Sequence, residues 1–157
     1  MSETFKEFMR IFPGYQDLKH QLLSLLTDAD LAHSFPGSPS LGELCKEIGE
    51  TEQSYIDSFK TLHLDFNYRN PDKALANSTS ALSAWYKKMD EEMQTALAAF
   101  TDTDLDSKKL GRGRWMVPIE LNLDIYLQAV MIFCGKAWVH LHALGKEMPE
   151  QWVDWIG

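Results

Sequence analysis

The sequence predicts an all-α fold, a four-helix bundle with long connections and an apolar C-terminal tail, and three observations support this prediction. Four segments repeat apolar residues at spacings of three and four, which is typical of amphipathic helices. No stretch of useful length alternates strictly between apolar and polar residues, as a half-buried strand does. The 157 residues, 45% hydrophobic and 24% charged, suit one core. We therefore expect a single helical domain over residues 1–157.

The first helix is expected over residues 15–27. Its apolar stripe consists of Tyr15, Leu18, Leu22, Leu25 and Leu26. A short aromatic turn precedes it, and Pro13-Gly14 is expected to kink or interrupt the chain there, because proline lacks the amide hydrogen that a helix interior uses. A loop with three helix breakers, residues 35–39, follows this helix.

The second helix should begin near Leu41, because Ser40 and Glu43 have the spacing of a capping box. Its stripe consists of Leu41, Leu44, Ile48, Tyr55, Phe59 and Leu62. A polar connection, residues 63–72, leads to a long third helix. Its expected face consists of Leu75, Leu82, Trp85, Met89, Met93, Leu97 and Phe100.

A polar stretch, residues 101–114, is expected to be an extended or turn segment before the fourth helix. Pro118 is placed for the first turn of that helix, and Gly145 for its C-terminal stop. Its face consists of Leu123, Tyr126, Leu127, Val130, Phe133, Ala137, Leu141 and Leu144. The tail from Met148 is too apolar to remain in water, so we expect it to pack on its own bundle or on a second subunit.

Composition limits the compartment and the partners. Fifteen Lys and Arg against 23 Asp and Glu give a net charge of −8, with no visible basic patch, which argues against nucleic acid. The apolar stretches are too short for a membrane span, and residues 1–7 contain acids and no apolar signal segment. Cys45 and Cys134 have no metal or redox spacing, which favours two buried thiols. We expect a cytoplasmic protein without a nucleic-acid or membrane partner.

Motif searches give no active site. Asp102, Asp104 and Asp106 imitate the start of a calcium loop, but Ser107 and Gly113 stand where glycine and glutamate are needed, so a solvated acidic turn is expected. No two of the five histidines are three or four residues apart, so no helical metal pair is expected. The run 90–92 after two lysines is expected to be an exposed, salt-bridged helix face.

Several short sequence segments occur in a characteristic order along the chain. They are 26–31 and 101–105 at two helix exits, 40–44 with 48–56 in the second helix, and 141–146 with Pro149 at the end. In this order and spacing they resemble the DinB/YfiT-like family of four-helix bundles over most of the chain. The resemblance implies homodimers, and it implies thiol-dependent transfer or hydrolysis for relatives that hold a metal.

The resemblance also implies a divalent metal held by one histidine in the second helix and two, at i and i+4, in the fourth. This sequence has Glu47, Ala129 and Phe133 at those positions. Two of the three have no donor atom, so we expect no metal and no cofactor. We expect side chains of the packed helices to fill the space that the metal site would occupy. The alternative is a relocated centre that uses Glu47, Glu50, Asp124 or Cys134.

A candidate ligand pocket surrounds these positions and consists of Glu47, Thr51, Tyr55, Tyr126, Ala129 and Phe133. Glu47 is expected to be partly buried beside Phe133, where its charged form is disfavoured unless it pairs with a polar neighbour such as Lys136 or a tyrosine.

Two functions stay open. The favoured one is a non-catalytic protein that binds a small ligand or a partner and keeps a vestigial metal site. The alternative is a metal-dependent enzyme, a thiol-dependent transferase or hydrolase, with a relocated metal centre. A homodimer is expected from the resemblance and from apolar residues outside the four stripes, such as Phe5, Trp115, Trp138 and Trp155.

Overall fold

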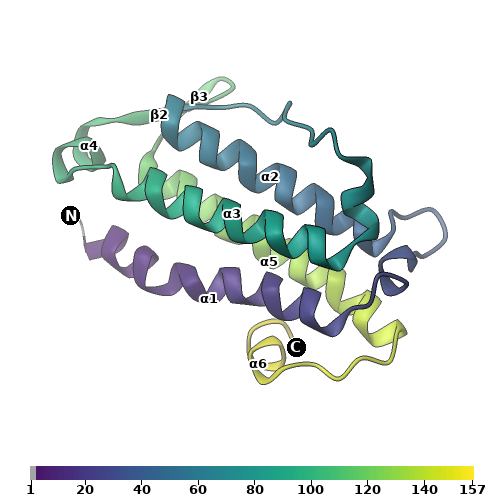
Figure 1. Ribbon diagram of the computed structural model, residues 1–157. Helices are drawn as coiled ribbons and strands as arrows, with labels where there is room; N and C mark the ends of the chain where they lie inside the picture. Colours follow the sequence, from purple (N-terminus) through teal and green to yellow (C-terminus); the bar gives the residue numbers. More distant parts are fainter. Residues whose placement is uncertain (1–2) are drawn as a thin grey trace.

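The computed structural model describes residues 3–157, with side chains from Phe5 onward. Four long helices lie side by side in this part of the chain (Figure 1). They are α1 (Glu3–Leu25), α2 (Leu41–Thr61), α3 (Thr79–Ala98) and α5 (Ile119–Ala143). α1 and α2 each pack against α3 and α5, so they lie diagonally across the bundle from each other. The prediction of an all-α four-helix bundle is confirmed.

Shorter elements occupy the connections. They are η1 (Asp30–Ala32), β1 (His63–Leu64), η2 (Lys73–Asn77), α4 (Asp102–Ser107), β2 (Lys109–Arg112), β3 (Trp115–Pro118) and α6 (Glu150–Ile156). β1 pairs in parallel with β2, and β2 pairs antiparallel with β3, which makes a small sheet at one end of the bundle (Figure 1). The sequence did not predict these strands, because two to four residues are too few to show an alternating pattern.

α1 continues through Pro13, so the predicted break there and the predicted helix start at residue 15 are wrong. Phe5 and Phe12 are each 1% exposed, so the turns before the proline pack into the core. Tertiary packing of an amphipathic face supplies most of a helix's stability, and it outweighs the one backbone hydrogen bond that proline removes.

The C-terminal tail packs on its own bundle, which resolves the alternative left open by the sequence. Trp152 of α6 is fully buried, and its Nε1 donates to the carbonyl oxygen of Leu18 at 3.1 Å. Gln151 Nε2 donates to the carbonyl oxygen of Gly14 at 2.9 Å. A Cβ on Gly14 would lie 2.9 Å from the ring of Trp155, so this glycine allows α6 to approach α1 closely.

The predicted helix starts are confirmed in part. The capping box of α2 is present, with Ser40 Oγ accepting from the Glu43 amide at 3.1 Å and the Glu43 carboxylate accepting from the Ser40 amide at 2.7 Å. Leu75 does not belong to the third helix, because it is buried in η2 and α3 begins after the Ser78 cap. Asp72 caps the start of η2, and Ser78, which ends η2 and caps the start of α3, separates the two elements.

The segment predicted as extended or turn, residues 101–114, holds α4 followed by β2. Thr101 and Asp104 form a capping box that starts α4. Pro118 is the N-cap of α5 rather than part of its first turn. Gly145 has φ +64°, which is the left-handed stop predicted after the fourth helix. None of the helices between residues 3 and 157 is long and apolar enough to cross a membrane.

A buried ion pair joins the two diagonal helices at the centre of the bundle. Lys19 of α1 and Glu52 of α2 are in contact, and both side chains are fully buried. Gln16 donates to Glu52 Oε1 at 2.7 Å and accepts from the hydroxyl of Tyr126, on α5, at 3.3 Å. Asp90 of α3 lies 3.6 Å from Lys19 Nζ. All four long helices therefore contribute to one polar network, in which burial raises the pKa of Glu52 and Lys19 opposes the shift.

Asp90 was predicted on an exposed face, and that prediction is wrong. Its side chain is 14% exposed, and its Oδ2 lies 2.5 Å from Nε2 of His20. Glu91, the next residue, is exposed as predicted, while Glu92 is half-buried and pairs with Lys60 at 3.0 Å. A run of acidic residues spreads around a helix by about 100° per residue, so one member turns toward α1 while its neighbours face water.

Removal of one partner of the central pair should destabilise the fold by about 3–5 kcal/mol, because the other charge is left buried. We expect this loss for Lys19→Met and for Glu52→Gln in urea unfolding. The double variant should lose clearly less than the sum of the two. Arg10→Met, which breaks an exposed pair with Glu7, should change stability little and serves as the control. Fully additive losses would contradict the coupling.

Candidate functional site

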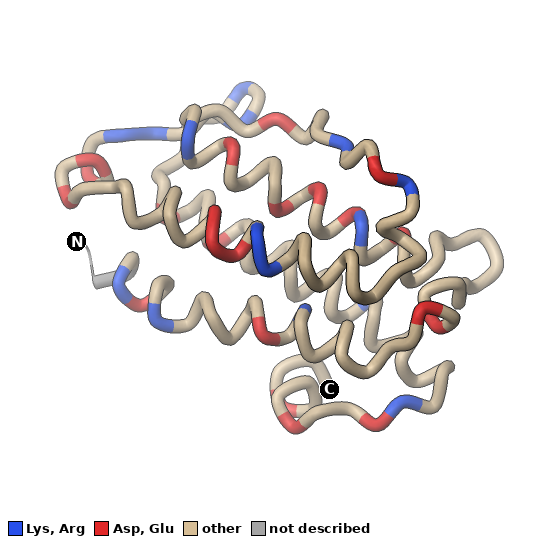
Figure 2. The backbone as a smooth tube through the Cα atoms, viewed as in Figure 1, with Lys and Arg blue, Asp and Glu red and all other residues tan. Residues whose placement is uncertain are grey.

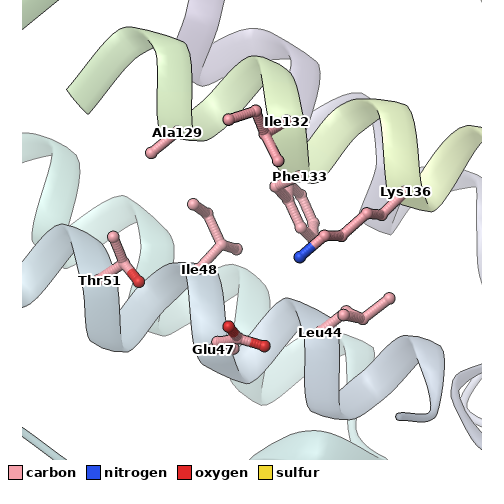
Figure 3. Close-up of a pocket in the computed structure, with 8 residues that line it drawn as sticks. All are labelled: Leu44, Glu47, Ile48, Thr51, Ala129, Ile132, Phe133 and Lys136. Atoms are coloured by element: carbon pink, nitrogen blue, oxygen red, sulfur yellow. The ribbon is translucent and has the colours of Figure 1, made fainter. Parts of the chain in front are cut away.

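A pocket of about 160 Å³ opens between α2 and α5 (Figure 3). Four of the six residues predicted for a pocket line it, namely Glu47, Thr51, Ala129 and Phe133. The other lining residues are Leu44, Ile48, Ile132 and Lys136. An apolar cavity of about 150 Å³ holds benzene in an engineered protein, so this volume suits a group of about one ring.

Helix geometry explains why these side chains converge. Glu47 and Thr51 lie one turn apart on α2, and Ala129 and Phe133 lie one turn apart on the facing α5. Ile48 and Phe133 are each 5% exposed and form the apolar floor. The positions that the resemblance assigns to a metal, Glu47, Ala129 and Phe133, therefore meet in one pocket.

Glu47 is exposed, so the prediction of a partly buried carboxylate is wrong. It extends from α2 toward the pocket mouth, and Lys136 extends toward the same mouth from α5 (Figure 3). Among the described residues, no hydrogen bond or ion pair joins Glu47 to Lys136 or to a tyrosine. The mouth therefore offers one acidic and one basic group above an apolar floor.

Tyr55 and Tyr126 were predicted to line the pocket, and the structure places them elsewhere. They are 2% and 0% exposed, and their rings lie 5.2 Å apart on the core side of α2 and α5. Tyr126 belongs to the central polar network, while Tyr55 accepts from Arg112 at 3.2 Å. Apolar periodicity identifies the buried face of a helix. It does not distinguish residues at the bundle centre from residues that line the groove between two helices.

Arg112 is a contact residue that the sequence analysis missed. Its Nη1 donates to Asn122 Oδ1 at 2.8 Å, and Asn122 Nδ2 donates to Ser58 Oγ at 3.1 Å. The guanidinium also lies over the ring of Tyr55, 5.6 Å from its centroid. These contacts fix the β2–β3 hairpin to the end of the bundle. In the sequence, Arg112 stands between two glycines and gives no sign of a buried partner.

A histidine pair lies beside the pocket. His33 Nδ1 and His140 Nδ1 are 2.9 Å apart, and the ring of Phe35 lies 4.9 Å from that of His140. Phe35 and His140 line a hollow of about 330 Å³ that shares Glu47 and Lys136 with the pocket. Burial lowers the pKa of His140, and the neighbouring His33 acts in the same direction. The sequence gives no sign of this pair, because a contact between distant positions leaves no local spacing.

The residues present do not fit a three-ligand metal centre. Ala129 and Phe133 have no donor atoms, and no group of three His, Cys, Asp or Glu between residues 3 and 157 is placed to hold a metal ion. The residues suggested for a relocated metal centre do not supply such a group of ligands either. Burial raises the pKa of Cys134 to about 12, which disfavours a thiolate ligand, and Glu50 accepts from the Asn70 amide at 3.0 Å. Asp124 accepts from Gln128 on the same helix at 2.7 Å.

The comparisons with known proteins support the fold. The sequence matches no protein-family model and no curated protein. A DinB-like protein of Bacillus cereus ATCC 10987 superposes with a TM-score of 0.77 at 20% identity, over 92% of this chain and 95% of that one. The DinB-like protein YjoA of Bacillus subtilis gives a TM-score of 0.72 at 16% identity, over 96% and 98%. The chain has the fold of DinB-like proteins, as the resemblance predicted.

The histidine pair predicts a pH dependence of stability. Because the pKa of His140 is lowered in the folded protein, the unfolded chain binds a proton near pH 6.5 that the folded chain does not bind. The contribution of His140 to the free energy of unfolding should therefore be fully present above that pH. It should fall as the pH is lowered through that value, by at most about 1.4 kcal/mol per pH unit. Urea unfolding at about pH 7.5 and about pH 5.5 tests this. His140→Gln should show a weaker dependence, and an unchanged one would exclude His140 as the cause.

Proposed function

We propose that this protein is a non-catalytic DinB-like protein that binds a small ligand in the pocket between α2 and α5. The observation that carries the proposal is an open pocket at the positions that the resemblance assigns to a metal, where Ala129 and Phe133 have no ligand atoms and Glu47 supplies a single carboxylate. A fold shared with other proteins transfers little about function, so the proposal rests on the site. The site offers apolar burial and two charged groups, and its lining contains no serine, cysteine or histidine.

The lining favours a particular kind of ligand. Ile48 and Phe133 offer an apolar floor, while Glu47 and Lys136 present opposite charges at the mouth. A ligand with one ring-sized apolar group and a polar or zwitterionic head suits this arrangement, because its apolar part leaves water while the head stays hydrated. Most small-molecule sites combine an apolar lining with a few polar groups in this way.

The proposal also places the protein in the cytoplasm, with a small molecule rather than nucleic acid as its ligand. Cys45 and Cys134 are free and buried, which suits a reducing compartment. Lys and Arg are distributed over several elements among acidic residues (Figure 2). Their densest group, residues 108–114, adjoins the three aspartates of α4. A phosphate backbone favours a continuous basic surface, which this distribution does not provide.

Filling the pocket should abolish ligand binding without loss of the fold. Ala129→Leu adds a side chain to the pocket lining, so the affinity for ring-sized probes such as indole or 3-phenylpropionate should fall at least about tenfold. Chemical-shift titration of the wild-type protein should show binding at about millimolar affinity, centred on residues 44–51 and 129–136. Ala143→Leu, at the exposed end of the same helix, is the matched control. Shifts centred elsewhere, or unaffected by Ala129→Leu, would contradict the proposal.

The alternative, a metal-dependent enzyme with a relocated centre, requires bound metal in the purified protein, whereas the proposal made here predicts the opposite. The purified wild-type protein should hold no stoichiometric zinc or nickel, and a chelator should leave its melting temperature unchanged. The triple variant Glu47→His, Ala129→His, Phe133→His places three imidazoles around the pocket and should regain about 4 kcal/mol at a thousandfold excess of metal over Kd. Metal analysis and thermal unfolding measure both results. One equivalent of metal in the wild-type protein would favour the enzyme.

A further inference from the structure

The hollow beside the pocket adjoins it along both helices. Leu44, Glu47 and Lys136 line the two cavities in common. The other walls of the hollow are mostly apolar or aromatic, and they consist of Phe35, Ser38, Pro39, Val139 and His140. The hollow has a volume of about 330 Å³, against about 160 Å³ for the pocket. A ligand that fills only the pocket therefore leaves the larger of the two adjoining spaces empty.

His140 lies at the end of the hollow that is farther from the pocket. Its side chain is 3% exposed, and its Nδ1 lies 2.9 Å from Nδ1 of His33. Its other ring nitrogen, Nε2, has no hydrogen-bond partner among residues 3–157. When His33 donates in the contact between the rings, Nε2 of His140 carries a proton that it can donate. Polar atoms of buried side chains ordinarily have partners, and because His140 lines the hollow, a ligand there can supply this one.

Lys136 adds a positive charge to the same end of the site. It lies one turn before His140 on α5, so the two side chains share a face of the helix. Among residues 3–157 it has no hydrogen bond or ion pair, so its ammonium group is available to a ligand. Glu47 also lines the hollow, but it is exposed on the opposite helix, where water and salt screen its repulsion of an anion. An ammonium group beside an imidazole N–H favours a carboxylate, because hydrogen bonds between charged groups are the stronger ones.

We propose that the pocket and the hollow together bind an elongated carboxylic acid, with its apolar end against Phe133 and its carboxylate at Lys136 and His140. The carboxylate site rests on the proposed function, because the same pocket receives the apolar end. Phe133 and His140 are seven residues apart on α5, which is about 10 Å along the helix. An extended chain advances about 1.2 Å per bond, so a ring joined to its carboxylate by about five methylenes spans this distance. Leu44, which lines both cavities, packs against the methylenes.

The first test compares 6-phenylhexanoate with its neutral amide, which has the same ring and chain. Chemical-shift titration should place both in the pocket, but the acid should bind at least about tenfold more tightly and should also shift residues 33–39 and 136–140. Lys136→Gln, at an exposed position, should reduce the preference for the acid at least about threefold. Lys87→Gln removes the same charge from an exposed position on α3 and should leave the preference unchanged.

The outcomes separate the carboxylate site from the proposed function. Equal binding of acid and amide at the pocket would overturn the carboxylate site and leave the proposed function intact. If neither these probes nor indole bound in the pocket, both proposals would be overturned. An equal loss of preference in Lys87→Gln and Lys136→Gln would show attraction by the overall charge and would also overturn the site.

The second test uses pH to detect the contact with His140. The titratable groups around its ring are His33 from the segment before α2, Glu47 from α2 and Lys136 from α5. Lysine and glutamate ordinarily titrate outside the range from about pH 6 to about pH 7.5, so the histidine pair is the part that takes up a proton there. A bound carboxylate favours the charged pair, so the affinity for 6-phenylhexanoate should rise at least about threefold as the pH falls through this range, while that for the amide stays constant. His140→Gln should remove the rise. A wild-type affinity for the acid that does not change with pH would overturn the placement of the carboxylate at His140.

Discussion

The contact between Lys19 and Glu52 constrains the arrangement of the whole bundle. It joins the two helices that lie diagonally across the bundle, and Gln16, Asp90 and Tyr126 connect it to the remaining two long helices. A buried charge tolerates little displacement from its partner, because separation in a medium of low polarity is costly. The pair therefore sets how far α2 lies along α1, and the rest of the bundle packs around that register.

The contact between Lys19 and Glu52 also determines where the pocket forms. Glu52 points to the bundle centre, whereas Glu47 and Thr51, on the neighbouring side of α2, face the groove along α5. The buried carboxylate fixes the position of α2 along the bundle. The side of α2 that lines the groove therefore lies opposite Ala129 and Phe133 of α5. A single acidic residue in the core thus contributes to the geometry of a site that it does not touch.

Much of the fold was predictable because it depends on local rules. Apolar spacing located the helices, the Ser40–Glu43 pair located a helix start, and Gly145 located a stop. Where local rules compete with tertiary contacts, the contacts decide, as they do at Pro13 and at Asp90. For the site, Glu47, Ala129 and Phe133, which the resemblance assigns to one place, line the same pocket. The resemblance did not show that Glu47 is exposed, because the depth of a groove depends on side chains from both helices. The contact of His33 with His140 depends on a tertiary approach that no local pattern encodes.

The docking of α6 on α1 has a consequence for the order of events during synthesis. The hydrogen bond from Trp152 to Leu18 joins positions separated by 134 residues, so the outer side of α1 has no cover while most of the chain is still being made. Contacts of such long range form late, because a long loop must close before they become favourable. The nascent bundle therefore exposes the surface of α1 on which Trp152 packs until α6 leaves the ribosome. During that interval this part of α1 is open to a chaperone or to a neighbouring nascent chain.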